Sequence, residues 1–145
     1  MATDRTAHVT WNGSLMDGSG TITETTTGAI GQQAVSWAAR SEDQPGGKTS
    51  PEELIAAAHA ACFSMALSHG LAQGGNPPEE LQTSATVTFQ PGEGITKIAL
   101  AVVGRVPGVD EDAFRAAAEG AKENCPVSKA LAAVPEITLD ARLGG

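Results

Sequence analysis

The chain has 145 residues, of which 41% are hydrophobic and only 3% aromatic, so aliphatic side chains must fill most of its core. This length suits one domain over residues 1–145, large enough to fold without a disulfide. The formal net charge of −8 argues against nucleic acid and against an anionic membrane surface as partners, because both are bound through Lys and Arg.

The N-terminal segment, MATDRTAHVTW, has no apolar stretch long enough for a signal peptide. No segment approaches the roughly 20 apolar residues of a membrane span. We therefore expect a cytoplasmic protein. In a reducing compartment structural disulfides are rare, which leaves catalytic, metal-binding or inert roles for the two cysteines, Cys62 and Cys125.

The first 40 residues alternate in polarity and are rich in Thr, Val, Ile and Trp, which is typical of strands. The predicted strands span residues 7–12, 19–25 and 33–39. A polar loop over 41–50, with one proline and two glycines, follows the third strand.

Residues 50–73 carry the strongest helix signal of the chain. Ser50 is expected as the N-cap, Pro51 at the first helical position, and Glu53 in a capping box. The segment is apolar nearly all round, which indicates a buried central helix. One small sheet can hardly cover such a helix, so a partner subunit is a candidate for the remaining cover.

The second half of the chain contains two alternating segments, two helical segments and a last alternating segment. The predicted strands are 81–90, 95–106 and 136–142, and the predicted helices are 110–123 and a short one that opens at Cys125-Pro126. Runs of strands and helices, rather than strict alternation, indicate an α+β fold with mostly antiparallel sheet.

The two cysteines stand in different local surroundings. Cys62 lies in the middle of the apolar helix, where a packing role is an equal alternative and burial would raise the thiol pKa. Cys125 is expected at the N-cap of the short helix, where the helix dipole and free N–H groups stabilise a thiolate. Local physics alone therefore favours Cys125 as the more acidic thiol.

Three further residues are candidates for the same site. Glu52 lies in the first helical turn, where the dipole alone would explain a carboxylate. Arg40 is expected to end a strand just before the loop, where an exposed arginine is the default. His59 lies three residues before Cys62 on the same helix face. His59, Cys62 and Cys125 could be zinc ligands, but no second close pair of ligands supports that alternative.

Four segments of the chain are similar to those of a known family: SPEELIAAAHAACFSMALSHGL, ENCPVSKAL, the strand ITKIAL and the terminal EITLDARL. Together they resemble the OsmC branch of the OsmC/Ohr family of osmotically inducible and organic hydroperoxide resistance proteins. The resemblance covers nearly the whole chain. It implies an intertwined α+β homodimer with two active sites at the subunit interface and with no metal or cofactor.

The resemblance also implies residue roles. Cys62 matches the peroxidatic cysteine, Cys125 the resolving cysteine, Glu52 the glutamate that holds the catalytic arginine, and Arg40 the arginine of the OsmC branch. Here the resemblance and the local physics disagree on which thiol attacks. We follow the resemblance, because a guanidinium beside Cys62 would stabilise its thiolate even in an apolar helix.

The implied reaction is the reduction of organic hydroperoxides, and more weakly of hydrogen peroxide. It passes through a Cys62 sulfenic acid and a Cys62–Cys125 disulfide, which an external dithiol, in the family often a lipoylated protein, reduces again. Leu54, Phe63 and Met65 are candidates for an apolar substrate pocket or for plain core. The alternative function is a non-enzymatic redox sensor or stress-related binding protein on the same scaffold.

Overall fold

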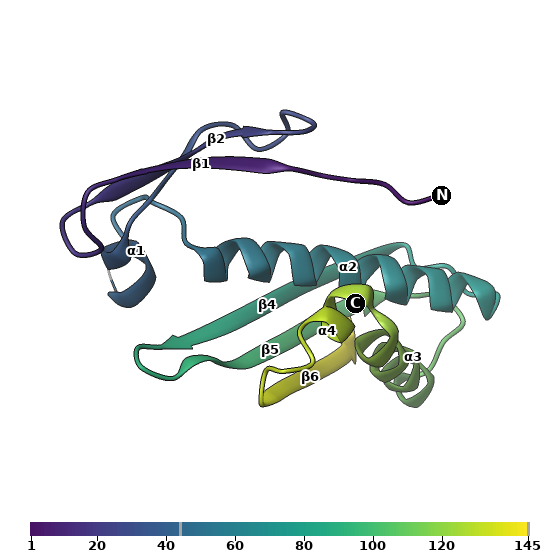
Figure 1. Ribbon diagram of the computed structural model, residues 1–145. Coiled ribbons are helices and arrows are strands. Elements are labelled where there is room, and N and C mark those ends of the chain that lie inside the picture. Colours follow the sequence, from purple (N-terminus) through teal and green to yellow (C-terminus); the bar gives the residue numbers. More distant parts are fainter. Residues whose placement is uncertain (44, 145) are drawn as a thin grey trace. The chain divides into compact units, whose positions relative to one another are not determined.

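The computed structural model of the protein describes residues 1–43 and 45–144 (Figure 1). The chain forms two compact units, Met1–Leu54 and Ile55–Gly145. The single domain predicted over residues 1–145 stays a prediction.

The first unit contains a three-stranded antiparallel sheet in the order β1-β2-β3. Its elements are β1 (Ala7–Asn12), β2 (Ser19–Thr25), β3 (Gln33–Val35) and the short helix α1 (Trp37–Ser41). The third predicted strand was too long, because the Ser36 hydroxyl accepts a hydrogen bond of 3.1 Å from the Ala39 backbone N–H and caps α1. The strand therefore ends at Val35, and Arg40 lies in a helix rather than at a strand end.

Helix α2 (Pro51–Gln73) begins as the sequence predicts, with Ser50 accepting a hydrogen bond of 3.2 Å from the backbone N–H of Glu53. The reciprocal half of the capping box differs from the prediction. The Glu53 carboxylate accepts a hydrogen bond of 2.7 Å from the Thr49 hydroxyl, one residue before the cap. The Glu53 side chain is thus hydrogen-bonded at the helix start, while its neighbour Glu52 is buried.

The second unit contains a sheet in the order β4-β5-β6. Its strands are β4 (Glu80–Gln90), β5 (Gly94–Arg105) and β6 (Glu136–Leu143), and its further helices are α3 (Glu111–Asn124) and α4 (Pro126–Ala130). β4 and β5 form a hairpin, whereas β5 and β6 are parallel because α3 and α4 make the crossover between them. The α+β class with mostly antiparallel pairing is confirmed.

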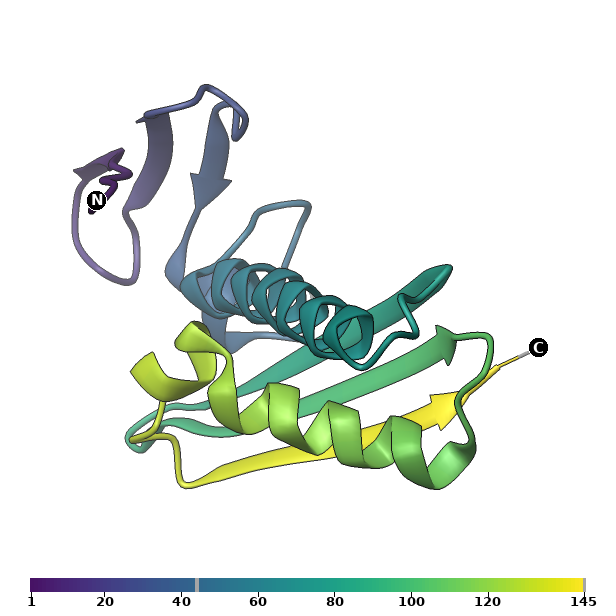
Figure 2. The same ribbon diagram turned by 90° about the vertical axis from the view of Figure 1, so that its right-hand side faces the viewer.

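Helices α2 and α3 cover the same face of this sheet (Figure 2). Phe63 and Leu67 of α2, Ile98 and Leu100 of β5, and Phe114 of α3 are all at most 1% exposed and form the centre of the core. Burial of these large side chains fixes the face that α2 turns to the sheet, and with it the direction of Cys62, one residue before Phe63.

The expectation that no segment could span a membrane needs correction. By length and composition alone, α2 is long and apolar enough, with a mean hydropathy of 1.4 over 18 residues. Core helices of soluble proteins pass the same test, and α2 packs one face into the core described above. Only 22% of that stretch is buried, so α2 also presents an apolar face that nothing in its own unit covers.

Candidate active site

The two thiols are brought together by α2 and by the junction of α3 and α4. Cys62 is in the middle of α2, and Cys125 is both the C-cap of α3 and the N-cap of α4. Figures 1 and 2 show α4 beside α2. Both cysteines are free thiols; Cys62 is half-buried and Cys125 has no exposed surface. Only Cys62 can therefore meet a molecule from solvent without a movement of the chain.

The two thiols interact, and their pKa values move in opposite directions. Burial and the hydrogen-bonding contact with Cys125 raise the pKa of Cys62, against a smaller lowering by the Val127 backbone. Burial also opposes ionisation of Cys125, but contacts with the Cys62 thiol, with Ser128 and with the Val127 backbone outweigh it and lower the pKa of Cys125. Within this unit, the negative charge is favoured on Cys125, as the local sequence physics predicts.

A buried His–Ser pair lies next to the thiols, and sequence reasoning missed it. His59 Nε2 lies 2.7 Å from Ser128 Oγ, with His59 fully buried and Ser128 7% exposed. The available signal was the spacing: His59 precedes Cys62 by three residues on a helix, and Ser128 follows Cys125 by three. Burial lowers the pKa of His59, so its imidazole is neutral at neutral pH.

Arg40 and Glu52 form an ion pair in the first unit, as predicted. Arg40 Nε donates to both carboxylate oxygens of Glu52 at 3.0 and 3.1 Å, and Nη2 lies 2.9 Å from Oε1. The Glu52 side chain is 8% exposed and that of Arg40 33% exposed. This planar contact uses the guanidinium edge, so it fixes the orientation of the group as well as its charge.

The four predicted site residues therefore form two pairs. Arg40 with Glu52 belongs to the first unit, and Cys62 with Cys125 to the second. That the two pairs act in one site stays a prediction.

The first unit also holds an apolar pocket of about 300 Å³ with Arg40 in its wall. Among the predicted pocket residues, Leu54 lines it. Phe63 is instead part of the core, and Met65 is 72% exposed on the surface of α2. The remaining apolar lining includes Val9, Trp11, Leu15, Ile22 and Trp37.

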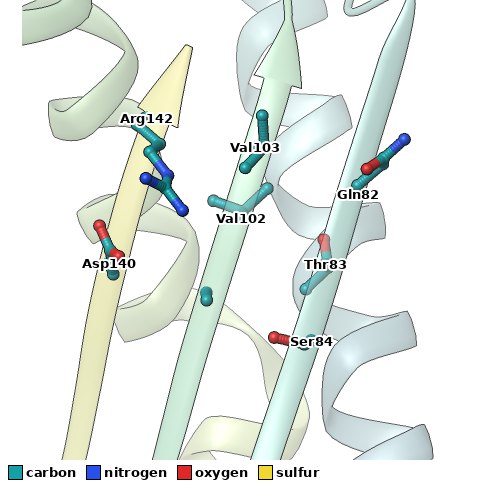
Figure 3. A pocket seen from close by; sticks show the side chains of 8 residues that line it. Gln82, Thr83, Ser84, Val102, Val103, Asp140 and Arg142 are labelled. Carbon is teal, nitrogen blue, oxygen red and sulfur yellow. The ribbon is translucent and has the colours of Figure 1, made fainter. Parts of the chain in front are cut away.

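A second hollow, of about 400 Å³, lies on the open face of the β4-β5-β6 sheet, with the helices behind it (Figure 3). Polar and charged side chains, among them Gln82, Ser84, Asp140 and Arg142, line it around the short side chains of β5. Among the residues that the structure describes, neither cysteine lines this hollow.

The zinc alternative lacks a ligand set. In the part of the chain that the structure describes, no three His, Cys, Asp or Glu side chains are grouped as a metal ion requires. The Nε2 atom of His59 is engaged by Ser128 instead.

Comparison with known proteins places this arrangement among redox proteins. The chain is 46% identical over 136 residues to the peroxiredoxin OsmC of Escherichia coli, covering 92% of each protein. It is 31% identical over 103 residues to the organic hydroperoxide resistance protein OhrB of Bacillus subtilis, covering 70% of this chain and 74% of OhrB.

A solved OsmC-like protein from Mycoplasma pneumoniae has the same fold, with a TM-score of 0.74 over the full length of both chains and 16% identity. The family model described as "OsmC-like protein" matches residues 44–140, a span that contains Glu52, Cys62 and Cys125 and begins four residues after Arg40. With the fold, the paired thiols and these matches, the chain belongs to the OsmC-like family.

Proposed function

We propose that this protein is a thiol-dependent peroxidase that reduces organic hydroperoxides, and hydrogen peroxide more slowly. The observation that carries the proposal is the half-buried thiol of Cys62 in contact with the fully buried thiol of Cys125. A peroxide can reach the first thiol, and the second is positioned to capture the oxidised product. The sequence identity of 46% to a peroxiredoxin supports the same peroxidase function.

In the proposed first step, the Cys62 thiolate attacks the terminal oxygen of the hydroperoxide. The O–O bond breaks, the alkoxide takes a proton and leaves as an alcohol, and Cys62 becomes a sulfenic acid. Cys125 then attacks the Cys62 sulfur, the S–O bond breaks, and water leaves as the disulfide forms. An external dithiol restores both thiols by exchange.

Arg40 and Glu52 are proposed to complete this site. The raised pKa of Cys62 keeps its thiolate scarce, so a cation is needed where the peroxide binds. The ion pair with Glu52 aims the Arg40 guanidinium, which can stabilise the thiolate and polarise the leaving oxygen. The guanidinium is supplied by the same chain or by a partner subunit. In this proposal residues 1–145 act as one functional domain.

The apolar pocket in the first unit supports organic hydroperoxides as substrates. Its lining is almost entirely hydrophobic, and among the described residues of its wall Arg40 is the charged one. An alkyl or aryl group can occupy the pocket while its peroxide group meets the guanidinium. Hydrogen peroxide has no such group, so it gains nothing from the pocket.

The remaining assignments follow from the same proposal. The reductant is an external dithiol, for which a lipoylated protein is the candidate, and the protein acts in the cytoplasm without a metal, a cofactor, nucleic acid or a membrane partner. The acidic balance of the chain, with a net charge of −8, supports the exclusion of nucleic acid.

We also propose a homodimer in which a second copy covers the apolar face of α2. Ala58, Ala61, Met65 and Ala72 are exposed at intervals of three, four and seven residues, which places them on one stripe of the helix. Small residues with one larger side chain at such spacing are suited to close packing against another helix.

Met65→Glu is expected to convert the dimer to monomers, because a carboxylate would lose its hydration inside an apolar interface. Sedimentation velocity at several protein concentrations measures the outcome. The matched control is Thr86→Glu, which adds the same charge on the exposed face of β4. A monomeric parent protein, or a Met65→Glu variant that stays dimeric, contradicts this interface.

A steady-state assay with dihydrolipoamide tests the peroxidase itself. We expect many turnovers per Cys62 with cumene or tert-butyl hydroperoxide and slower turnover with hydrogen peroxide. The alternative of a redox sensor makes the opposite prediction, a single oxidation without turnover. If no dithiol supports more than one turnover, the peroxidase proposal fails and the sensor remains.

A further inference from the structure

The pair formed by His59 and Ser128 has no part in the reaction proposed above, although it lies against Cys125. Both residues are buried, and their side chains meet at 2.7 Å. His59 Nδ1 is also buried and has no hydrogen-bond partner within residues 1–43 and 45–144. A buried polar side chain with one unused ring nitrogen is costly to keep, so its position beside a redox pair calls for a chemical role.

The number of hydrogen bonds that the Ser128 hydroxyl can donate decides what that role is. A serine hydroxyl has one hydrogen, so it cannot donate to both His59 and Cys125. If His59 carried its proton on Nδ1, Ser128 would have to donate to Nε2, and a buried N–H would be left without an acceptor. If the proton is on Nε2, His59 donates to Ser128, and the Ser128 hydrogen is free to point at the Cys125 sulfur.

The second arrangement leaves only an unused lone pair on Nδ1, which is less costly than a buried N–H group without an acceptor. Burial also keeps the imidazole neutral, so the donor is an N–H of fixed position rather than a mobile charge. The titratable group in contact with this pair is Cys125, through Ser128, and Cys125 in turn contacts Cys62. Within residues 55–144, no carboxylate, Lys or Arg is among the groups that shift the pKa of His59, Cys62 or Cys125.

We propose that neutral His59, protonated on Nε2, is a positioning residue that turns the Ser128 hydroxyl toward Cys125 and thereby prepares the resolving thiolate. The relay runs from His59 Nε2–H to Ser128 Oγ, and from Ser128 Oγ–H to the Cys125 sulfur. The contact between Ser128 and Cys125, which lowers the pKa of that thiol, agrees with this direction.

The effect of this relay on disulfide formation rests on the proposed peroxidase function, whereas its effect on the pKa of Cys125 does not. In the resolving step Cys125, already ionised, forms the S–S bond while the S–O bond of the Cys62 sulfenic acid breaks and hydroxide leaves as water after taking a proton. The relay adds no reagent and consumes none. It raises the fraction of Cys125 that is ready to attack, and so shortens the life of a sulfenic acid that further peroxide could over-oxidise.

The direct test is a thiolate titration of Cys125 by ultraviolet absorbance in a Cys62→Ala background, where one thiol remains. In this background His59→Met, which fills similar space without a donor, should raise the pKa of Cys125 by about one unit, a tenfold loss of thiolate below the pKa. Ser128→Ala should do the same. His59→Gln, which keeps an N–H donor near the Nε2 position, should restore most of the shift.

The titration uses reduced protein and no peroxide, so it succeeds or fails independently of the peroxidase activity. An unchanged pKa in His59→Met, or a His59→Gln variant that behaves like His59→Met, overturns the relay. In the parent protein, disulfide formation after one equivalent of peroxide should be about threefold faster than in His59→Met. The difference is smaller than tenfold because a more basic thiolate is also more nucleophilic.

A spectroscopic measurement keeps the inference testable if the variants do not fold. Nitrogen-15 spectra of the reduced parent protein distinguish protonated from unprotonated imidazole nitrogens. We expect His59 to carry its proton on Nε2 across neutral pH. A proton on Nδ1, or a doubly protonated ring, would overturn the proposal without any substitution.

Discussion

Replacing Cys62 with serine is expected to reduce peroxide turnover to the rate seen without enzyme. The hydroxyl of serine stays protonated at neutral pH and is a far weaker nucleophile than a thiolate, while the neighbouring thiol, Cys125, is fully buried and cannot meet the substrate. Turnover of cumene hydroperoxide with dihydrolipoamide measures the loss. The variant should keep its fold, because serine has the same side-chain shape as cysteine and is only slightly smaller, and Cys62 is half-buried.

The matched variant, Cys125→Ser, separates attack from resolution. It should still consume one equivalent of peroxide per Cys62 and accumulate a sulfenic acid or a mixed disulfide, which mass spectrometry detects. The reverse pattern, with the first equivalent lost in Cys125→Ser and kept in Cys62→Ser, would exchange the roles. The pKa directions of the two thiols make that outcome a physical alternative, since Cys125 holds the thiolate more readily within its unit.

Arg40→Ala is expected to slow the oxidation of Cys62 by about 10²–10³-fold, the usual effect of removing one charge-stabilising donor from a reaction centre. Stopped-flow kinetics under single-turnover conditions isolates this step from resolution. Arg40→Lys keeps the charge but cannot match the planar contact with Glu52, so its oxidation rate should lie between those of the parent protein and Arg40→Ala. Glu52→Gln keeps the shape of the carboxylate and should lower the rate less than Arg40→Ala.

The pH profile of the same step shows whether Arg40 acts on the thiolate. Burial raises the pKa of Cys62, so without a nearby cation its reactive form should appear only as the pH rises well above neutral. We expect a nearly flat rate around neutral pH in the parent protein and a rate that rises with pH in Arg40→Ala. An equal fall at every pH would limit Arg40 to polarising the peroxide, and no fall at all would remove Arg40 from the site.

Prediction from sequence was most accurate where a local signal and the tertiary structure agree. The predicted cap at Ser50 accepts a hydrogen bond from the backbone N–H of Glu53 and begins α2. The prediction of a strand over 33–39 was wrong at its end, because the alternation of polarity continues past Val35. The Ser36 cap that ends the strand starts a helix of only five residues. The expectation that no segment could span a membrane was wrong on composition itself, because α2 has a mean hydropathy of 1.4 over 18 residues.

By itself, the sequence determined the α+β class and the family. The short helix α1 was not predicted, and the roles of Arg40, Glu52, Cys62 and Cys125 stay what the family resemblance implies. Periodicity carries the fold class and the family motifs carry the resemblance, both without any knowledge of contacts between distant segments. Only the tertiary structure decided the burial of Cys125, the opposite pKa directions of the two thiols, and the contact between His59 and Ser128. These properties depend on desolvation and on hydrogen bonds between residues about 60 to 70 positions apart, which no local pattern records.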